Sequence, residues 1–157
     1  MLIISDTHGD YPHAVSAVES AGSVDLIVHL GDGFEDARII EAIGQLPVLK
    51  VTGNCDPVAE AERDILVTLA DKTVMITHGD RYAVKSGLSR LHKRAMELKV
   101  NIVLYGHTHH AAIDTIGTIF FINPGCLNTK SREASYAILT IDNGGIAARI
   151  IPFPDKS

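Results

Sequence analysis

The chain has 157 residues, which suits one domain, and we expect a single domain over residues 1–157. Hydrophobic residues make up 46% of the chain and charged residues 21%, as in an ordinary globular protein. The formal net charge of -5 argues against non-specific nucleic-acid binding, which needs clustered Lys and Arg.

No apolar run approaches the roughly 18 residues that span a bilayer, so we expect no membrane partner. The N-terminal segment is apolar but lacks the basic start and the small-residue cleavage site of a signal peptide. A cytoplasmic location follows as the default expectation. The two cysteines, Cys55 and Cys126, are too few for a disulfide framework.

The first two thirds of the chain alternate between strand-like and helix-like segments. Short apolar runs predict strands at residues 2–5, 25–30, 47–51, 64–70, 73–77 and 101–105. Apolar residues at helical spacing predict helices at residues 12–21, 34–43 and 86–98. Gly22 and Gly44 end the first two helices.

The last third of the chain changes character. Short β-branched segments at residues 111–115, 118–122, 137–141 and 146–151 are separated by turn residues and predict antiparallel strands. Alternating strands and helices followed by hairpins indicate a mixed α/β (α+β) fold. Its two mixed sheets would have helices on the outside.

Five strand-like segments end in residues of types that bind metals. These endings are Asp6-Thr7-His8, Gly31-Asp32, Gly53-Asn54, His78-Gly79 and Gly106-His107-Thr108-His109. Ligand sites collect at the carboxyl ends of strands, which lie about 4.8 Å apart, so these side chains can meet in one small volume. Asp6 and His8, like His107 and His109, would project to the same side of an extended chain. His110 would point the other way, and we expect it to be structural or solvated.

Two carboxylates, one amide oxygen and four imidazoles favour metal binding over acid–base chemistry alone, because without cations they would be poorly compensated. Two divalent ions and two carboxylates leave a net charge of about +2, which matches one bridging hydroxide and one phosphodiester anion. Two ions about 3.5–4 Å apart can activate water and clamp an in-line displacement at phosphorus. Mixed imidazole and oxygen ligands disfavour Ca. We expect two divalent ions, Mn first, with Ni, Fe, Zn, Co or Mg as alternatives.

The order of these five motifs resembles the calcineurin-like metallophosphoesterase superfamily, and the compact length resembles its small single-domain YfcE-like phosphodiesterase branch. The resemblance implies a four-layer αββα sandwich of two mixed sheets flanked by helices. It also implies that Asp6, His8 and His109 bind one metal, that Asn54, His78 and His107 bind a second, and that Asp32 bridges both. We expect Asp32, Asn54 and His107 to be catalytic.

The chain departs from the superfamily pattern after Gly53-Asn54, where many members have a His that donates a proton or contacts phosphate. Here that position is Cys55, so the general acid stays unassigned. We consider Cys55 and Arg81 as substrate contacts. Asp56 either orients a ligand such as His107 or caps the next segment. Asn123-Pro124-Gly125 resembles a segment of the family that lies near the site.

These features predict a metal-dependent phosphodiesterase that acts on small phosphodiester substrates. A phosphomonoesterase or a nucleotide pyrophosphatase is an enzymatic alternative, because the same two metals could serve either reaction. A third reading is a protein-binding scaffold that resembles a retromer subunit of the same superfamily. Whether the chain forms a homo-oligomer stays open.

Overall fold

The computed structural model describes residues 1–57, 61–143 and 145–153. Its strands form two five-stranded sheets, each with parallel and antiparallel pairs. Sheet A has the strand order β10 (Gly145–Pro152), β9 (Ser135–Asp142), β1 (Leu2–Ile4), β2 (Ile27–His29) and β3 (Val48–Lys50). Sheet B has the order β4 (Asp64–Leu69), β5 (Lys72–Thr77), β6 (Ile102–Leu104), β8 (Ile119–Asn123) and β7 (Ala112–Ile116).

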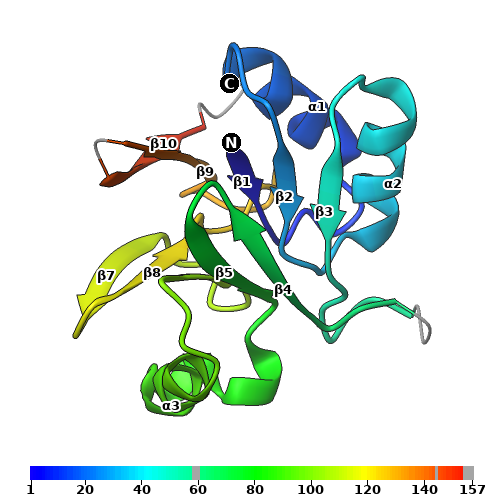
Figure 1. The fold of residues 1–157 in the computed structure, drawn as a ribbon. Helices are drawn as coiled ribbons and strands as arrows, with labels where there is room; N and C mark the ends of the chain where they lie inside the picture. Colours follow the sequence, from blue (N-terminus) through cyan, green and yellow to red (C-terminus); the bar gives the residue numbers. More distant parts are fainter. Residues whose placement is uncertain (58–60, 144, 154–157) are drawn as a thin grey trace.

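Three helices cover the outer faces of the two sheets (Figure 1). Helices α1 (Tyr11–Ser20) and α2 (Phe34–Ile43) pack on sheet A, and α3 (Ser89–Glu97) packs on sheet B. Two short 3-10 helices, η1 (Asp80–Tyr82) and η2 (Val84–Ser86), precede α3. The result is the four-layer αββα sandwich that the resemblance implied. None of the helices in the described ranges has both the length and the apolar character needed to cross a bilayer.

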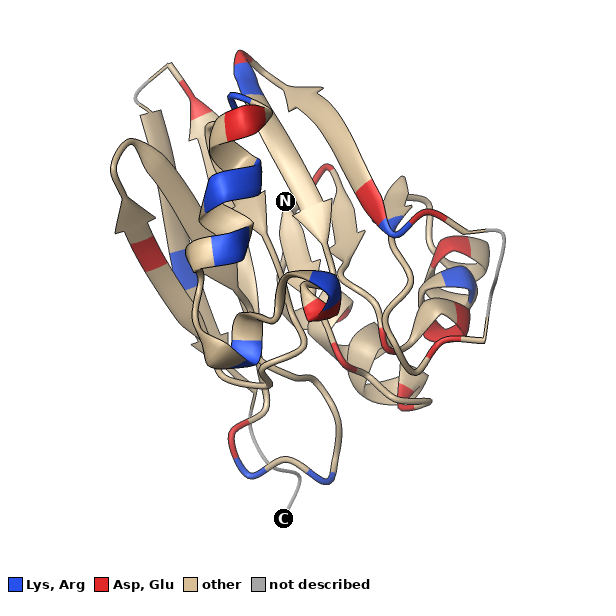
Figure 2. Ribbon diagram, turned by 90° about the horizontal axis from the view of Figure 1, so that it is seen from below, with Lys and Arg blue, Asp and Glu red and all other residues tan. Residues whose placement is uncertain are grey.

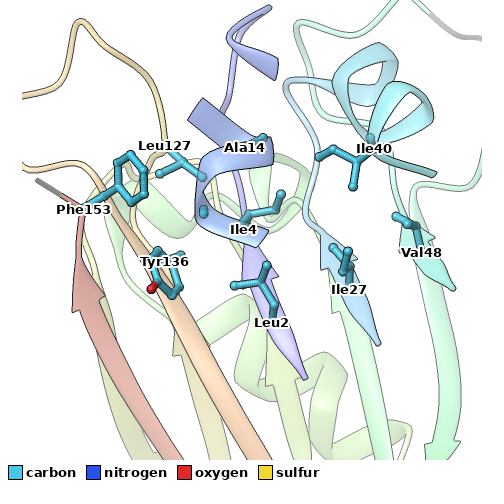
Figure 3. Close-up of a cluster of buried hydrophobic side chains, with 11 residues drawn as sticks. Leu2, Ile4, Ala14, Ile27, Ile40, Val48, Leu127, Tyr136 and Phe153 are labelled. Carbon is cyan, nitrogen blue, oxygen red and sulfur yellow. The ribbon is translucent and has the colours of Figure 1, made fainter. Parts of the chain in front are cut away.

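Three hydrophobic clusters hold the four layers together. Side chains of β1 alternate between two of them, because successive residues of a strand point to opposite faces. Leu2 and Ile4 contact α1 and α2, as the close-up in Figure 3 shows, whereas Ile3 points between the sheets. The third cluster joins sheet B to α3 through residues such as Leu91 and Phe121. Burial on both faces explains why the central strands are continuous apolar runs.

The predicted elements agree with the observed ones, with small differences at their ends. The helix at residues 34–43 is confirmed, whereas the helix predicted at residues 86–98 starts at Ser89 because η2 occupies the preceding turn. The prediction of antiparallel strands in the last third is confirmed for the β7–β8 and β9–β10 pairs. However, β8 also pairs in parallel with β6, and β9 crosses into sheet A beside β1.

Asp56 fixes the loops that follow β2 and β3. Its carboxylate accepts hydrogen bonds of 2.8–3.0 Å from the backbone N–H groups of Asp32, Gly33, Phe34 and Gly53. Because Phe34 begins α2, the negative charge of Asp56 also lies at the positive end of that helix. Asp56 therefore does position a predicted ligand, but it acts through the main chain of Asp32 rather than through His107.

A buried polar network joins the loop after β1 to the loop after β2. His29 Nδ1 accepts the N–H of Gly31 at 3.2 Å, so the proton of the neutral ring lies on Nε2, 3.1 Å from Thr7 Oγ1. The Thr7 hydroxyl donates to Asp36 Oδ2 at 2.5 Å, and Gly9 N–H donates to the same oxygen at 2.9 Å. His29 is fully buried, and its burial lowers its pKa to about 4.

We predict that Asp56→Ala lowers the free energy of unfolding by about 3 kcal/mol, since four backbone N–H groups lose a charged acceptor. Urea denaturation of the metal-free protein measures this change. Asp71→Ala is the matched control, because Asp71 is exposed and its one ion pair among the described residues is with its neighbour Lys72. The control should stay within about 0.5 kcal/mol of the wild type. Equal stabilities of the two variants would show that Asp56 does not anchor these loops.

We also predict that His29 makes the folded state sensitive to acid. The pKa of His29 is about 4 in the folded protein and near 6.5 in the unfolded chain. Protons therefore bind preferentially to the unfolded chain as the pH falls from 6.5 to 4, and stability decreases by up to about 3 kcal/mol. In urea titrations of metal-free protein, His29→Gln should flatten this pH dependence, whereas the exposed His110→Gln should retain it. An unchanged slope in His29→Gln would contradict the assignment.

Candidate metal centre

The candidate site lies where the carboxyl ends of strands from both sheets meet. Sheet A contributes Asp6 and His8 after β1, Asp32 after β2 and Asn54 after β3, and sheet B contributes His78 after β5 and His107 and His109 after β6. Backbone hydrogen bonds join the loops: Asp6 N–H donates to the Gly31 carbonyl at 3.0 Å, and Gly106 N–H donates to the His78 carbonyl at 3.0 Å.

The backbone at the site is left-handed rather than extended. Asp6, His8, Asp32, His107 and His109 all have positive φ angles, between 49° and 68°. Non-glycine residues rarely adopt this conformation, and its concentration here marks a functional site. The expectation that extended chain would align Asp6 with His8 and His107 with His109 is therefore wrong. Tight turns bring these side chains to the site instead.

One group of potential ligands consists of Asp6, His8 and His109, whose ligand atoms all lie within 4.8 Å of one another. His109 Nε2 is 3.1 Å from Asp6 Oδ1, and His8 Nε2 is 3.4 Å from His109 Nε2. Asp6 is fully buried. Its second oxygen, Oδ2, accepts hydrogen bonds from the Ser5 hydroxyl at 2.5 Å and from the His107 N–H at 3.1 Å.

A second group consists of Asp32, His78 and His107. His78 Nε2 lies 3.4 Å from Asp32 Oδ2, 3.1 Å from His107 Nδ1 and 3.2 Å from Asn54 Oδ1. The other ring nitrogen of His78, Nδ1, donates to the Leu30 carbonyl at 2.8 Å. That bond directs the Nε2 atom of a neutral His78 ring toward the centre as an available ligand.

The two groups are joined by a third, in which the ligand atoms of His8, Asp32 and Cys55 lie within 4.8 Å of one another. Asp32 Oδ1 accepts the N–H of Cys55 at 2.8 Å. A Cβ atom on Gly53 would lie 2.1 Å from Asp32 Oδ1, so only glycine allows the carboxylate to sit here. Burial and the negative charge of Asp32 raise the pKa of the Cys55 thiol.

The carboxylates of the site are held in their ionised form. Burial alone would raise the pKa of Asp6, but the contact with His109, the charge of His78 and the Ser5 hydroxyl outweigh it and lower this pKa. Burial opposes ionisation of Asp32 as well, yet His78 and the Cys55 N–H bring its pKa well below the ordinary value. Two buried anions therefore face a cluster of imidazole nitrogens.

The side chains fit divalent cations. Asp6 Oδ1 is buried and receives no hydrogen bond from the described residues. The ring nitrogens of His8 and His109 approach each other, as do those of His78 and His107. Such nitrogen pairs repel when their lone pairs point at one another, and shared cations remove that repulsion. Mixed imidazole and oxygen donors suit transition metals.

Arg81 and His110 lie outside these three groups. Arg81 is exposed, and its Nη1 atom lies 3.6 Å from Asp64 Oδ2, so its proposed contact with substrate stays a prediction. His110 is exposed, as expected. Asn123 supports the site, because its side-chain amide donates to the Gly106 carbonyl at 3.1 Å and to Thr108 Oγ1 at 2.9 Å.

Sequence reasoning missed three residues that support the ligands. Ser5 binds the Asp6 carboxylate, and the Asn128 side-chain amide donates to the Asp6 carbonyl at 3.0 Å. Arg63 donates to the Gly53 carbonyl at 3.0 Å and pairs with Asp80. Ser5 could have been suspected because it adjoins Asp6. The other two carry no local signal, since their partners are distant in the chain.

Comparisons with known proteins agree with this geometry. The chain is 32% identical over 154 residues to a probable metallophosphoesterase of Bacillus subtilis, YsnB, covering 95% of this chain and 88% of that protein. It is 26% identical to the phosphodiesterase YfcE of Escherichia coli, with coverage of 90% and 88%. A Streptococcus pneumoniae structure, described as a conserved uncharacterized protein and predicted phosphoesterase, superposes with a TM-score of 0.82 at 27% identity, covering 96% and 87%.

A family model described as the calcineurin-like phosphoesterase superfamily domain matches residues 1–144. This match spans every element that contributes a side chain to the candidate site. It also agrees with the two mixed sheets and outer helices of the fold. The chain therefore belongs to the calcineurin-like phosphoesterase superfamily.

Proposed function

We propose that the protein hydrolyses small phosphodiesters at a dinuclear metal centre. The observation that carries this proposal is the continuity of the three ligand groups. The first group shares His8 with the middle one, and the middle one shares Asp32 with the last. Such a row of donors supports two neighbouring cations better than one isolated cation.

Seven side chains would hold the two ions. Asp6, His8 and His109 would bind the first ion, Asn54, His78 and His107 would bind the second, and Asp32 would bridge them. Two bound divalent ions would activate a water molecule for attack on phosphorus and neutralise the charge that develops on the phosphate oxygens. Manganese is the metal we propose first, because the donors mix imidazole with oxygen.

The protein's own residues orient this chemistry. The Leu30 carbonyl sets the tautomer of His78, and the Cys55 N–H fixes one oxygen of Asp32. The raised pKa of Cys55 keeps its thiol neutral, and a neutral thiol is a poor proton donor to a leaving alcohol. We therefore expect substrates whose leaving groups depart without help from a protein acid.

Activity on an activated diester tests the proposal. Protein stripped with EDTA and reloaded with Mn²⁺ should hydrolyse bis(4-nitrophenyl) phosphate, and removal of the metal should abolish the reaction. The rate on 4-nitrophenyl phosphate should be lower; a higher rate on this monoester would favour the phosphomonoesterase alternative. Protein that neither hydrolyses these esters nor takes up metal at micromolar concentration would support the scaffold alternative.

Asp32→Asn tests the bridging role. We predict that this variant loses metal and activity together, with a fall in rate of at least about 100-fold, because one side chain serves both ions. Metal content by mass spectrometry and the rate on the diester are measured on the same sample. Asp114→Asn, on the exposed part of β7, is the control and should match the wild type. Retention of two ions and full rate in Asp32→Asn would exclude the bridge.

A further inference from the structure

A cavity of about 940 Å³ adjoins the candidate metal centre. The two share His8 and His109, so a molecule in the cavity would be in contact with the first group of ligands. Further walls come from residues 9–12, which include Tyr11 at the start of α1, and from the loop at residues 128–133, with Thr7, His110 and Cys126 completing the lining. The volume falls within the range of about 300–1,000 Å³ that is usual for small-molecule sites.

The loop at residues 128–133 is fastened to the segment that carries Asp6 and His8. Asn128 is buried, and its amide binds the Asp6 carbonyl while its Oδ1 atom accepts the Lys130 N–H at 3.1 Å. The Thr129 N–H donates to Asp10 Oδ2 at 2.8 Å. The loop therefore keeps a defined position relative to the metal ligands, as a wall of a binding site must.

Two cations of this loop line the cavity, namely Lys130 and Arg132. Both are exposed, and neither forms an ion pair within the described part of the chain. Asp10 also lines the cavity, but its carboxylate already accepts the Thr129 N–H and lies 3.5 Å from His13 Nδ1. Glu133 is the remaining acid of the lining.

The charge of the scissile phosphodiester does not account for these cations. That group carries one negative charge, which the proposed metal centre would balance by itself. Lys130 and Arg132 therefore face a volume in which a second anion would find donors, and Arg in particular binds phosphate through two parallel hydrogen bonds. In Figure 2 the loop that projects at the lower edge of the protein carries basic segments and an acidic segment beside one of them, as the order Arg132-Glu133 requires.

We infer that this cavity binds a second anionic group of the substrate, attached to one alcohol of the scissile diester, and that Lys130 and Arg132 contact it. The inference rests on the proposed function for its link to the diester. The half-exposed ring of Tyr11 offers an apolar wall for the carbon skeleton between the two charged groups. The substrate class is thus a phosphodiester with an additional phosphate or a similar anion.

A matched pair of substrates tests this inference. Ethyl 4-nitrophenyl phosphate and 2-(phosphonooxy)ethyl 4-nitrophenyl phosphate share a leaving group and differ by one phosphate. The wild-type enzyme with Mn²⁺ should prefer the second substrate by about tenfold in kcat/KM. The double variant Lys130→Gln/Arg132→Gln should lose this preference while keeping its rate on the ethyl ester within about twofold.

The control is Arg90→Gln/Lys93→Gln, which removes the same charge from exposed positions on α3 and should keep the preference. A loss of equal size on both substrates, or an unchanged preference in the Lys130/Arg132 variant, would overturn the inference. Absence of hydrolysis of both substrates by the wild type would contradict the proposed function instead.

Binding to metal-free protein decides the role of the cavity independently of catalysis. Calorimetric titration with 2-(phosphonooxy)ethyl 4-nitrophenyl phosphate should give a Kd about tenfold weaker for the Lys130/Arg132 variant than for the wild type. The α3 control should bind like the wild type. Equal affinity of the Lys130/Arg132 variant and the wild type, or no measurable binding to either, would refute the contact.

Discussion

The structure depends on the convergence of two carboxylates and four imidazoles in one small, partly buried volume. Asp6 is fully buried and keeps its charge, yet one of its oxygens lacks a hydrogen bond within the described residues. A buried carboxylate is costly even beside His109, whose Nε2 atom lies 3.1 Å from Asp6 Oδ1, so stability alone does not favour this arrangement. Bound divalent cations would compensate these charges, which agrees with the chain's membership in a phosphoesterase family.

The surrounding fold holds the candidate ligands in place, although the ring nitrogens of neighbouring histidines lie close together. Five of the candidate ligand residues adopt left-handed backbone conformations, which persist only where the surroundings fix them. Asp56, Thr7 and His29 supply that constraint through hydrogen bonds between the loops. Short central strands, buried on both faces, anchor the loops in the two hydrophobic layers beneath. The packing of these strands therefore offsets the cost of the left-handed backbone conformations in the loops.

The local sequence pattern was sufficient to predict the helices and strands but not the pairing of the strands in the two sheets. Apolar spacing predicted the helix at residues 34–43, and the residue types after each apolar run indicated the candidate ligands. Both signals are local, because they depend on neighbours in the chain. It did not place β9 beside β1 or β8 beside β6, because these pairings join residues more than 15 positions apart. Similarly, Asp56 and Asn128 act on backbone groups of distant residues, and side-chain type alone does not reveal such partners.

The division of the candidate ligands between the two sheets bears on stability as well as on chemistry. Asp6, His8, Asp32 and Asn54 follow strands of sheet A, whereas His78, His107 and His109 follow strands of sheet B. An ion bound by both sets would act as a cross-link that closes one rim of the sandwich, and its binding energy would add to folding stability. Without metal, the loops that follow β1, β2, β3, β5 and β6 would open before the rest of the protein. Proteases would then cleave these loops preferentially.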